Sequence, residues 1–143
     1  MRFTLISAGI YNLIWGTWIV LFPAAFFRWA KMAPTNYPQI WQCVGMIVGV
    51  YGIGYLIAAR DPLRHWPIVL VGLLGKLLGP AGMGWSVLRD GLPANMAWTC
   101  LPNDVIWWVP FGLILLRGFI HQRIEVQRPD ACNATFSTTN NRL

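Results

Sequence analysis

The sequence is poor in charged residues, and acidic ones are especially scarce. Of its 143 residues, 11% are Asp, Glu, Lys or Arg, and five are acidic. A water-soluble domain carries about 25% charged residues, so this chain lacks the charge to cover a water-facing surface. It also has only two His and three Cys, with no C-x-x-C pair and no His/Cys cluster. These absences argue against a zinc site, a haem site and a thioredoxin-type redox pair, and we expect no metal and no cofactor.

The charge that is present does not favour a nucleic-acid partner. The net charge is +6, but the cations occur one or two at a time between long apolar runs. Lys and Arg are placed in this way in the loops that flank membrane helices. We therefore expect the lipid bilayer as partner and no nucleic acid.

Four long apolar runs define the fold class. They predict an all-α integral membrane bundle of four transmembrane helices, over residues 3–22, 41–59, 66–88 and 101–120. Pro23 is expected to end or kink the first helix. Residues 1–120 form one predicted domain, followed by a basic and then polar tail over 121–143 that we predict to be disordered and cytoplasmic.

The basic residues also predict an orientation. With four helices, the N-terminus, the second loop and the tail lie on one side, which holds seven cations against three on the other. The seven are Arg2, Arg60, Arg64, Arg117, Arg123, Arg128 and Arg142, and the three are Arg28, Lys31 and Arg89. The excess marks the cytoplasmic side. We predict a multi-pass protein of a bacterial inner membrane with both termini in the cytoplasm.

The third apolar run carries a lysine almost at its centre. A charge at this depth costs about 2.5–3.5 kcal/mol on insertion scales, so it usually faces a bundle interior and a partner. On a helix, Gly72, Gly79, Pro80 and Met83 share a face with this Lys76. Pro80 is expected to kink the helix and to free backbone carbonyls that a buried donor could use. The pattern predicts a buried polar spot in the bundle.

Other polar residues extend this spot into a predicted track. Asp104 is the acidic candidate, but a start of the fourth helix near residue 101 puts it about 10–12 Å from Lys76 along the membrane normal. A direct ion pair then needs tilt or a bridging water, and Asn12 is the closer expected partner. Gln42 and Asn103 are predicted at the depth of Asp104. The track is either a ligand or proton site or a set of contacts that only fix helix packing.

Two further patterns carry weaker signals. Gly45 and Gly49 form a G-x-x-x-G motif, which permits close helix contact in membranes but is frequent by chance. Cys43 and Cys100 are predicted at the same end of their helices, where they could form a disulfide or act as a thiol pair. The alternative is that both are small packing residues. The many aromatic residues are expected to form interfacial belts, with Trp107 and Trp108 the candidates to line a cavity.

Several short motifs together resemble a known group of proteins. They are Asn12-Leu-Ile-Trp15-Gly16, Leu21-Phe22-Pro23, the run from Cys43 to Gly49, Ala59-Arg60-Asp61-Pro62 and Asn103-Asp104-Val-Ile-Trp107-Trp108. Across residues 5–120 the chain resembles uncharacterised small bacterial four-helix inner-membrane proteins and is loosely similar to DoxX-like proteins. The resemblance implies a fold and a location, and its motifs match no enzyme signature.

Three functions remain open from the sequence. We expect a non-catalytic accessory subunit of a membrane complex, because the glycine stripes offer surfaces for other membrane subunits or for a homo-oligomer. The first alternative is a transporter or small-ligand-binding protein that uses Lys76, Asp104, Asn103, Asn12 and Gln42. The second is a thiol-based membrane redox enzyme that uses Cys43 and Cys100.

Overall fold

A computed structural model describes residues 1–33, 35–89 and 91–126, and within these ranges the regular structure is entirely helical. The helices are α1 (Arg2–Leu21), α2 (Pro23–Trp29), α3 (Pro38–Ala58), α4 (Trp66–Leu88), the 3₁₀ turn η1 (Ala94–Thr99), the π turn η2 (Leu101–Val105) and α5 (Ile106–Val126). The predicted all-α class is confirmed.

Four helical segments in the described part of the chain are long and apolar enough to cross a membrane. They are Arg2–Leu21, Pro38–Ala58, Trp66–Leu88 and Met96–Ile124. The fold is thus consistent with a multi-pass membrane protein. The fourth segment differs from its predicted bounds of 101–120, because it begins with η1 and η2 and continues to Val126. The predicted tail therefore starts as helix, and its remainder, with Cys132, lies outside the described residues.

Proline placement explains where several helices begin. Pro23, Pro38 and Pro67 each lie in the first turn of their helix, where a missing N–H costs nothing. The first helix ends at Leu21, as the position of Pro23 predicts. Pro23–Trp29, which lies between the first two predicted spans, forms the additional short helix α2.

The closest helix pair is α1 with α3, and two reciprocal glycine pairs hold it. A Cβ on Gly16 would lie 2.5 Å from the carbonyl oxygen of Gly45, and one on Gly45 would lie 2.8 Å from that of Gly16. Gly9 and Gly52 oppose each other in the same way, at 2.9 and 2.8 Å. Small residues let membrane helices approach this closely. The contact uses a seven-residue spacing on each helix, and a Cβ on Gly49 would meet nothing within 4 Å.

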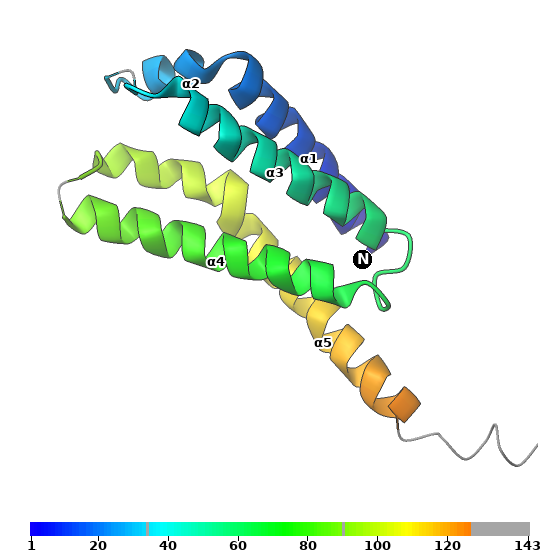
Figure 1. Ribbon diagram of the computed structural model, residues 1–143. Helices are drawn as coiled ribbons and strands as arrows, with labels where there is room; N and C mark the ends of the chain where they lie inside the picture. Colours follow the sequence, from blue (N-terminus) through cyan, green and yellow to red (C-terminus); the bar gives the residue numbers. More distant parts are fainter. Residues whose placement is uncertain (34, 90, 127–143) are drawn as a thin grey trace, which may run out of the picture.

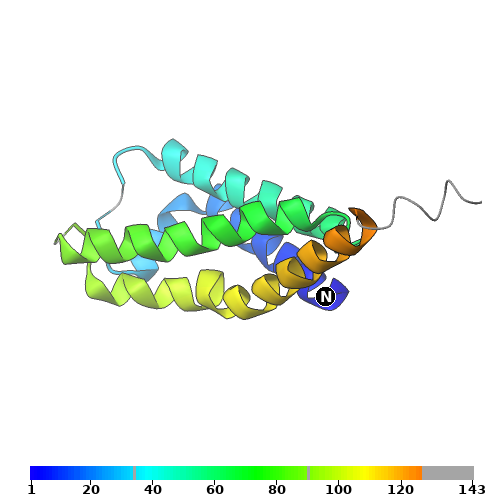
Figure 2. The same cartoon turned by 90° about the horizontal axis from the view of Figure 1, so that it is seen from below.

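The helices form two pairs whose backbones lie close together at one end and diverge toward the other (Figure 1). Figure 1 shows α1 beside α3 and α4 beside α5, with the N-terminus and the α3–α4 loop at the end where the pairs meet, and Figure 2 shows the same bundle from below. A core cluster around Tyr55, Val69 and Phe111 packs the closed end. A second cluster around Phe26 and Met96 packs the opposite end. The polar residues lie between these two clusters.

Candidate functional site

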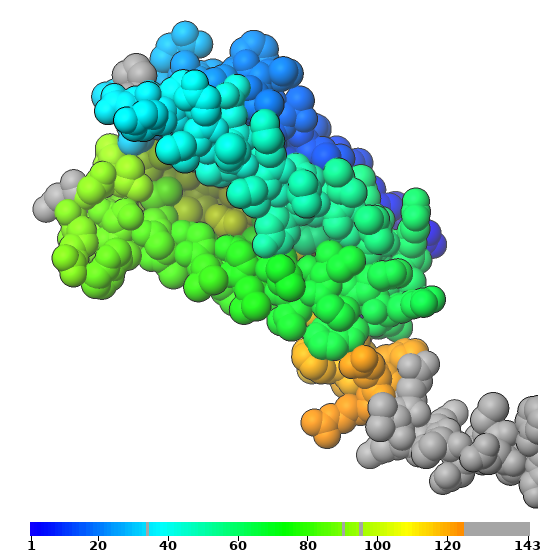
Figure 3. Space-filling model, in the orientation of Figure 1, coloured from blue at the N-terminus to red at the C-terminus, as the bar shows by residue number. Residues whose placement is uncertain are grey.

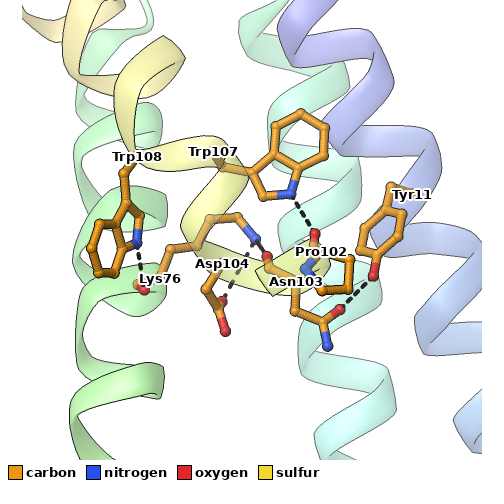
Figure 4. A network of polar contacts seen from close by, with 7 residues as sticks. All are labelled: Tyr11, Lys76, Pro102, Asn103, Asp104, Trp107 and Trp108. Carbon is orange, nitrogen blue, oxygen red and sulfur yellow. Dashed lines mark hydrogen bonds and ion pairs between the residues drawn. The ribbon is translucent and has the colours of Figure 1, made fainter. Parts of the chain in front are cut away.

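Lys76 is buried in the middle of the bundle and pairs with the segment that precedes α5. Its ammonium donates a hydrogen bond to the backbone oxygen of Asn103 at 2.5 Å and stands 3.9 Å from Oδ1 of Asp104 (Figure 4). The side chains of Lys76 and Asp104 are 8% and 21% exposed. The 3.9 Å separation exceeds the 2.7–2.9 Å or so of a charge-assisted hydrogen bond, so the two groups attract as charges. Among the described residues, Asp104 is the acidic partner of the buried lysine.

This direct pair corrects the depth expected from the sequence. The 10–12 Å offset assumed that Asp104 lies in the first turn of a helix beginning near residue 101. Instead the membrane-compatible segment begins at Met96, so Asp104 lies more than a turn inside it. The π turn η2 carries both Asn103 and Asp104 toward α4. π turns occur mostly as single-turn insertions in helices and are frequent at functional sites.

The backbone carbonyl of Lys76 lacks its usual partner within α4, and a tryptophan of α5 supplies the missing hydrogen bond. Pro80 has no N–H, so it cannot bond to the carbonyl four residues earlier, which belongs to Lys76. The indole Nε1 of Trp108 donates to that carbonyl at 3.0 Å. The expectation that Pro80 frees a carbonyl for a buried donor is confirmed, and α5 supplies the donor.

Two further side chains fix η2 beside the lysine. Trp107 donates its indole N–H to the carbonyl of Pro102 at 3.0 Å, and its ring centroid lies 5.9 Å from the Lys76 ammonium. Tyr11 of α1 donates its hydroxyl to Oδ1 of Asn103 at 2.7 Å. Trp107 and Trp108 were the predicted candidates to line a cavity, but neither borders the two cavities described below. Sequence reasoning missed Tyr11, although it directly precedes Asn12 in a helix with few other polar groups.

The ion pair borders a cavity of about 320 Å³, here called the central cavity. Its wall comes from α1, α3, α4 and η2: Asn12, Trp15, Val44, Ile47, Val48, Tyr51, Tyr55, Gly72, Gly75, Lys76, Gly79, Asn103 and Asp104. Figure 3 shows a hollow between α3 and α4 with yellow atoms of the later chain at its base. Four of the five residues of the predicted track therefore meet at one cavity. Asn12 is buried on its wall, and in the described chain its side chain forms no hydrogen bond to Lys76.

A second cavity of about 280 Å³, here called the end cavity, adjoins the first. The two share Trp15, Gly79, Asn103 and Asp104, so the carboxylate borders both. The rest of the end cavity is mainly aromatic and methionine side chains: Phe26, Phe27, Met32, Trp41, Met83, Leu92, Met96, Thr99 and Cys100.

These aromatic rings pack against one another inside the bundle, whereas Trp29, Trp85 and Trp98 are exposed as a membrane belt predicts. The indole nitrogen of Trp41 is buried and has no hydrogen-bond partner within the described ranges.

Gly72 of α4 makes room for a side chain rather than for a neighbouring backbone. A Cβ on Gly72 would collide with the ring and hydroxyl of Tyr55. A Cβ on Gly79 would lie 3.5 Å from Oδ2 of Asp104. On the face of α4 that carries Lys76, Gly72 thus admits the ring of Tyr55, whereas Gly79 faces the Asp104 carboxylate at ordinary contact distance.

Three predicted site residues do not meet at the ion pair. Gln42 donates to the carbonyl of Val20 at 2.8 Å, which satisfies the end of α1 instead of extending the polar track. Cys43 and Cys100 are free thiols, the first exposed on α3 and the second buried beside the end cavity. The structure therefore contains no disulfide between them. Within the described residues no cluster of three or more His, Cys, Asp or Glu forms that could hold a metal ion.

The comparisons with known proteins find no matching family model, no similar curated protein and no similar solved structure.

Proposed function

We propose that this chain is a small-ligand-binding or transport protein whose ligand occupies the central cavity at Lys76 and Asp104. The observation that carries the proposal is that the buried ion pair borders an open volume of about 320 Å³. An ion pair that served packing alone would be closed in by side chains, because an intramembrane charge left beside empty space is costly. Ligand pockets commonly have volumes of about 300–1,000 Å³ and combine an apolar wall with a few polar groups.

The polar groups that border the cavities are suited to hold a ligand. The Asp104 carboxylate touches Lys76 only as a charge at 3.9 Å, which leaves its oxygens able to accept hydrogen bonds. The ammonium donates to Asn103 and has three N–H donors in all. The buried N–H of Trp41 adds an unused donor beside the end cavity. A bound molecule would satisfy these groups.

We place the protein in a bacterial inner membrane with both termini in the cytoplasm. The seven-to-three distribution of cations supports this orientation. The N-terminus and the α3–α4 loop lie at the same end of the bundle, as this orientation requires (Figure 1). A relation to DoxX-like proteins, and a role as an accessory subunit of a membrane complex, stay predictions from the sequence.

The proposal is tested by gentle purification from native membranes, followed by native mass spectrometry and solvent extraction. We expect a bound small molecule of defined mass on the parent protein. Lys76→Met and Asp104→Asn should lose it. An empty parent protein, or equal occupancy in both variants, would overturn the proposal, and a stoichiometric partner protein on an empty bundle would favour the accessory-subunit prediction.

A cavity-filling variant guards against misfolding of the charge variants. Gly75 borders the central cavity and a Cβ there meets nothing within 4 Å, so Gly75→Leu fills space without touching the ion pair. Gly82 lies on the same helix, also has open space and borders neither cavity. We expect Gly75→Leu to release the ligand and Gly82→Leu to retain it.

A further inference from the structure

The central cavity is bordered by exposed residues in the middle part of α3. Val44 and Ile47 of α3 border the cavity, and both are also exposed on the outer surface, by 38% and 57%. Ile47 lies near the middle of Pro38–Ala58 and Val44 about one turn closer to its start, while Lys76 lies near the middle of Trp66–Leu88. The hollow between α3 and α4 in Figure 3 is therefore at the depth of the hydrocarbon core.

The surface beside this opening is apolar. A shallow groove between α3 and α4 is lined by Val50, Tyr51, Gly54, Pro67, Ile68 and Val71. Tyr51 borders both this groove and the central cavity. The apolar groove and the central cavity therefore adjoin at Tyr51, so apolar surface lies directly beside the opening.

The opposite charges of Lys76 and Asp104 restrict the net charge of a ligand that binds beside them. Lys76 and Asp104 carry opposite formal charges, so together they are neutral. A ligand with a net charge would leave one charge without a partner at a depth where an unpaired charge is costly. A neutral molecule with a hydrogen-bonding head avoids this cost.

We propose that the ligand is a neutral lipophilic molecule with a hydroxyl or similar donor head, and that it enters from the bilayer between α3 and α4. This inference rests on the proposed function and adds the class of ligand and its route. The head group donates to the Asp104 carboxylate, and the apolar body lies against the apolar wall of the central cavity, which includes Val48 and Tyr55. The polar base of the cavity favours such a molecule over a second copy of this chain, which would present only apolar surface to buried charges.

The route is tested with a neutral lipophilic photolabel, trifluoromethyl-phenyl-diazirine, on the protein in liposomes. Tyr55 is 1% exposed and borders the central cavity, so its labelling reports entry. Ile47→Trp places a larger side chain at the opening, and we expect it to lower Tyr55 labelling several-fold. Ile53→Trp is the matched control, since Ile53 is 51% exposed on the same helix and borders neither cavity. Equal Tyr55 labelling in the parent and in Ile47→Trp would overturn the lateral route.

The extracted ligand and a water-soluble reagent separate this inference from the proposed function. We expect a neutral, solvent-extractable molecule, and Gly75→Cys in a Cys43→Ser/Cys100→Ser/Cys132→Ser background should resist a membrane-impermeant maleimide. A charged, water-soluble ligand that Gly75→Leu releases would overturn the lateral route and leave the proposed function standing. A parent protein that carries no ligand and takes no label at Tyr55 would overturn both. A second copy that covers the opening and blocks the label would overturn this inference alone.

Discussion

The indole N–H of Trp108 completes the backbone hydrogen bonding of α4 at the carbonyl of Lys76. The donor–acceptor distance is 3.0 Å, and the bond replaces the one that Pro80 cannot make. In hydrocarbon there is no water to satisfy a carbonyl, so the donor has to come from the protein. The bond joins α5 to α4 at the residue that carries the buried charge.

Trp108→Phe should lower the free energy of unfolding by about 1–3 kcal/mol, because it leaves this carbonyl unsatisfied. Unfolding in detergent micelles, followed by circular dichroism, would measure the change. Trp98→Phe is the control, since Trp98 is 71% exposed, and it should cost little. In a Pro80→Ala background the residue at 80 supplies its own N–H, so Trp108→Phe should cost less there. Equal costs in both backgrounds would contradict the assigned role.

Gly16→Ala should destabilise the α1–α3 pair by about 1–3 kcal/mol, the usual cost of overpacking. The added methyl would meet the Gly45 carbonyl at 2.5 Å, and a backbone atom cannot move aside without moving its helix. Gly49→Ala changes the other helix of the pair at an open position and should be nearly neutral. The same unfolding measurement checks both variants, and a larger loss for Gly49→Ala would refute the assigned packing.

Lys76→Met should lower the free energy of unfolding by about 3–5 kcal/mol, because it leaves Asp104 as an unpaired charge inside the bundle. The double variant Lys76→Met/Asp104→Leu removes both charges and should be more stable than Lys76→Met. A double-mutant cycle on unfolding free energies gives the coupling between the two residues. If the two losses simply add, the ion pair does not exist in the folded protein.

Cys43 and Cys100 should both be thiols in the purified protein, because the structure holds them as free side chains. Mass spectrometry after alkylation without reductant should find both residues modified in the unfolded chain. A Cys43→Ser/Cys100→Ser variant should keep its fold and its ligand. A Cys43–Cys100 disulfide, or loss of ligand in the double variant, would revive the redox alternative.

A reporter fused after Val126 should be cytoplasmic, since four spans return the chain to the side of its N-terminus. An alkaline phosphatase fusion at this point should be inactive, and a green fluorescent protein fusion should fluoresce. The matched position is the segment between α2 and α3, where the phosphatase fusion should be active. The opposite pattern would reverse the proposed orientation.

Much of the fold was predictable because hydrophobic runs determine membrane spans directly. The third predicted helix, residues 66–88, agrees with α4, and Pro23 marks the end of α1. The fourth segment was harder, because Pro93 and Pro102 interrupt its start while η1 and η2 continue it as non-α turns. Such turns depend on contacts with α4, which local sequence does not contain.

The sequence predicted most residues of the site, but it did not predict which of them contact one another. Lys76, Asp104, Asn103 and Asn12 do meet at one cavity. Gln42 instead donates a hydrogen bond to the carbonyl of Val20 at the end of α1. The sequence contains no pattern that predicts this contact between two helices. The Lys76–Asp104 contact was not predicted, because the helical segment that carries Asp104 begins at Met96, earlier than the sequence indicated.

The glycine contacts also define how the sequence can change over evolution. Gly16 and Gly45 face each other's carbonyl oxygens. Because these oxygens belong to the backbone, no substitution at another position can make room for a side chain there. These positions should therefore stay glycine in every homologue that keeps this fold. Gly72 faces the side chain of Tyr55, which a smaller residue could replace. Positions 72 and 55 should therefore vary together, and their pairing would record changes in the shape of the central cavity that both residues border.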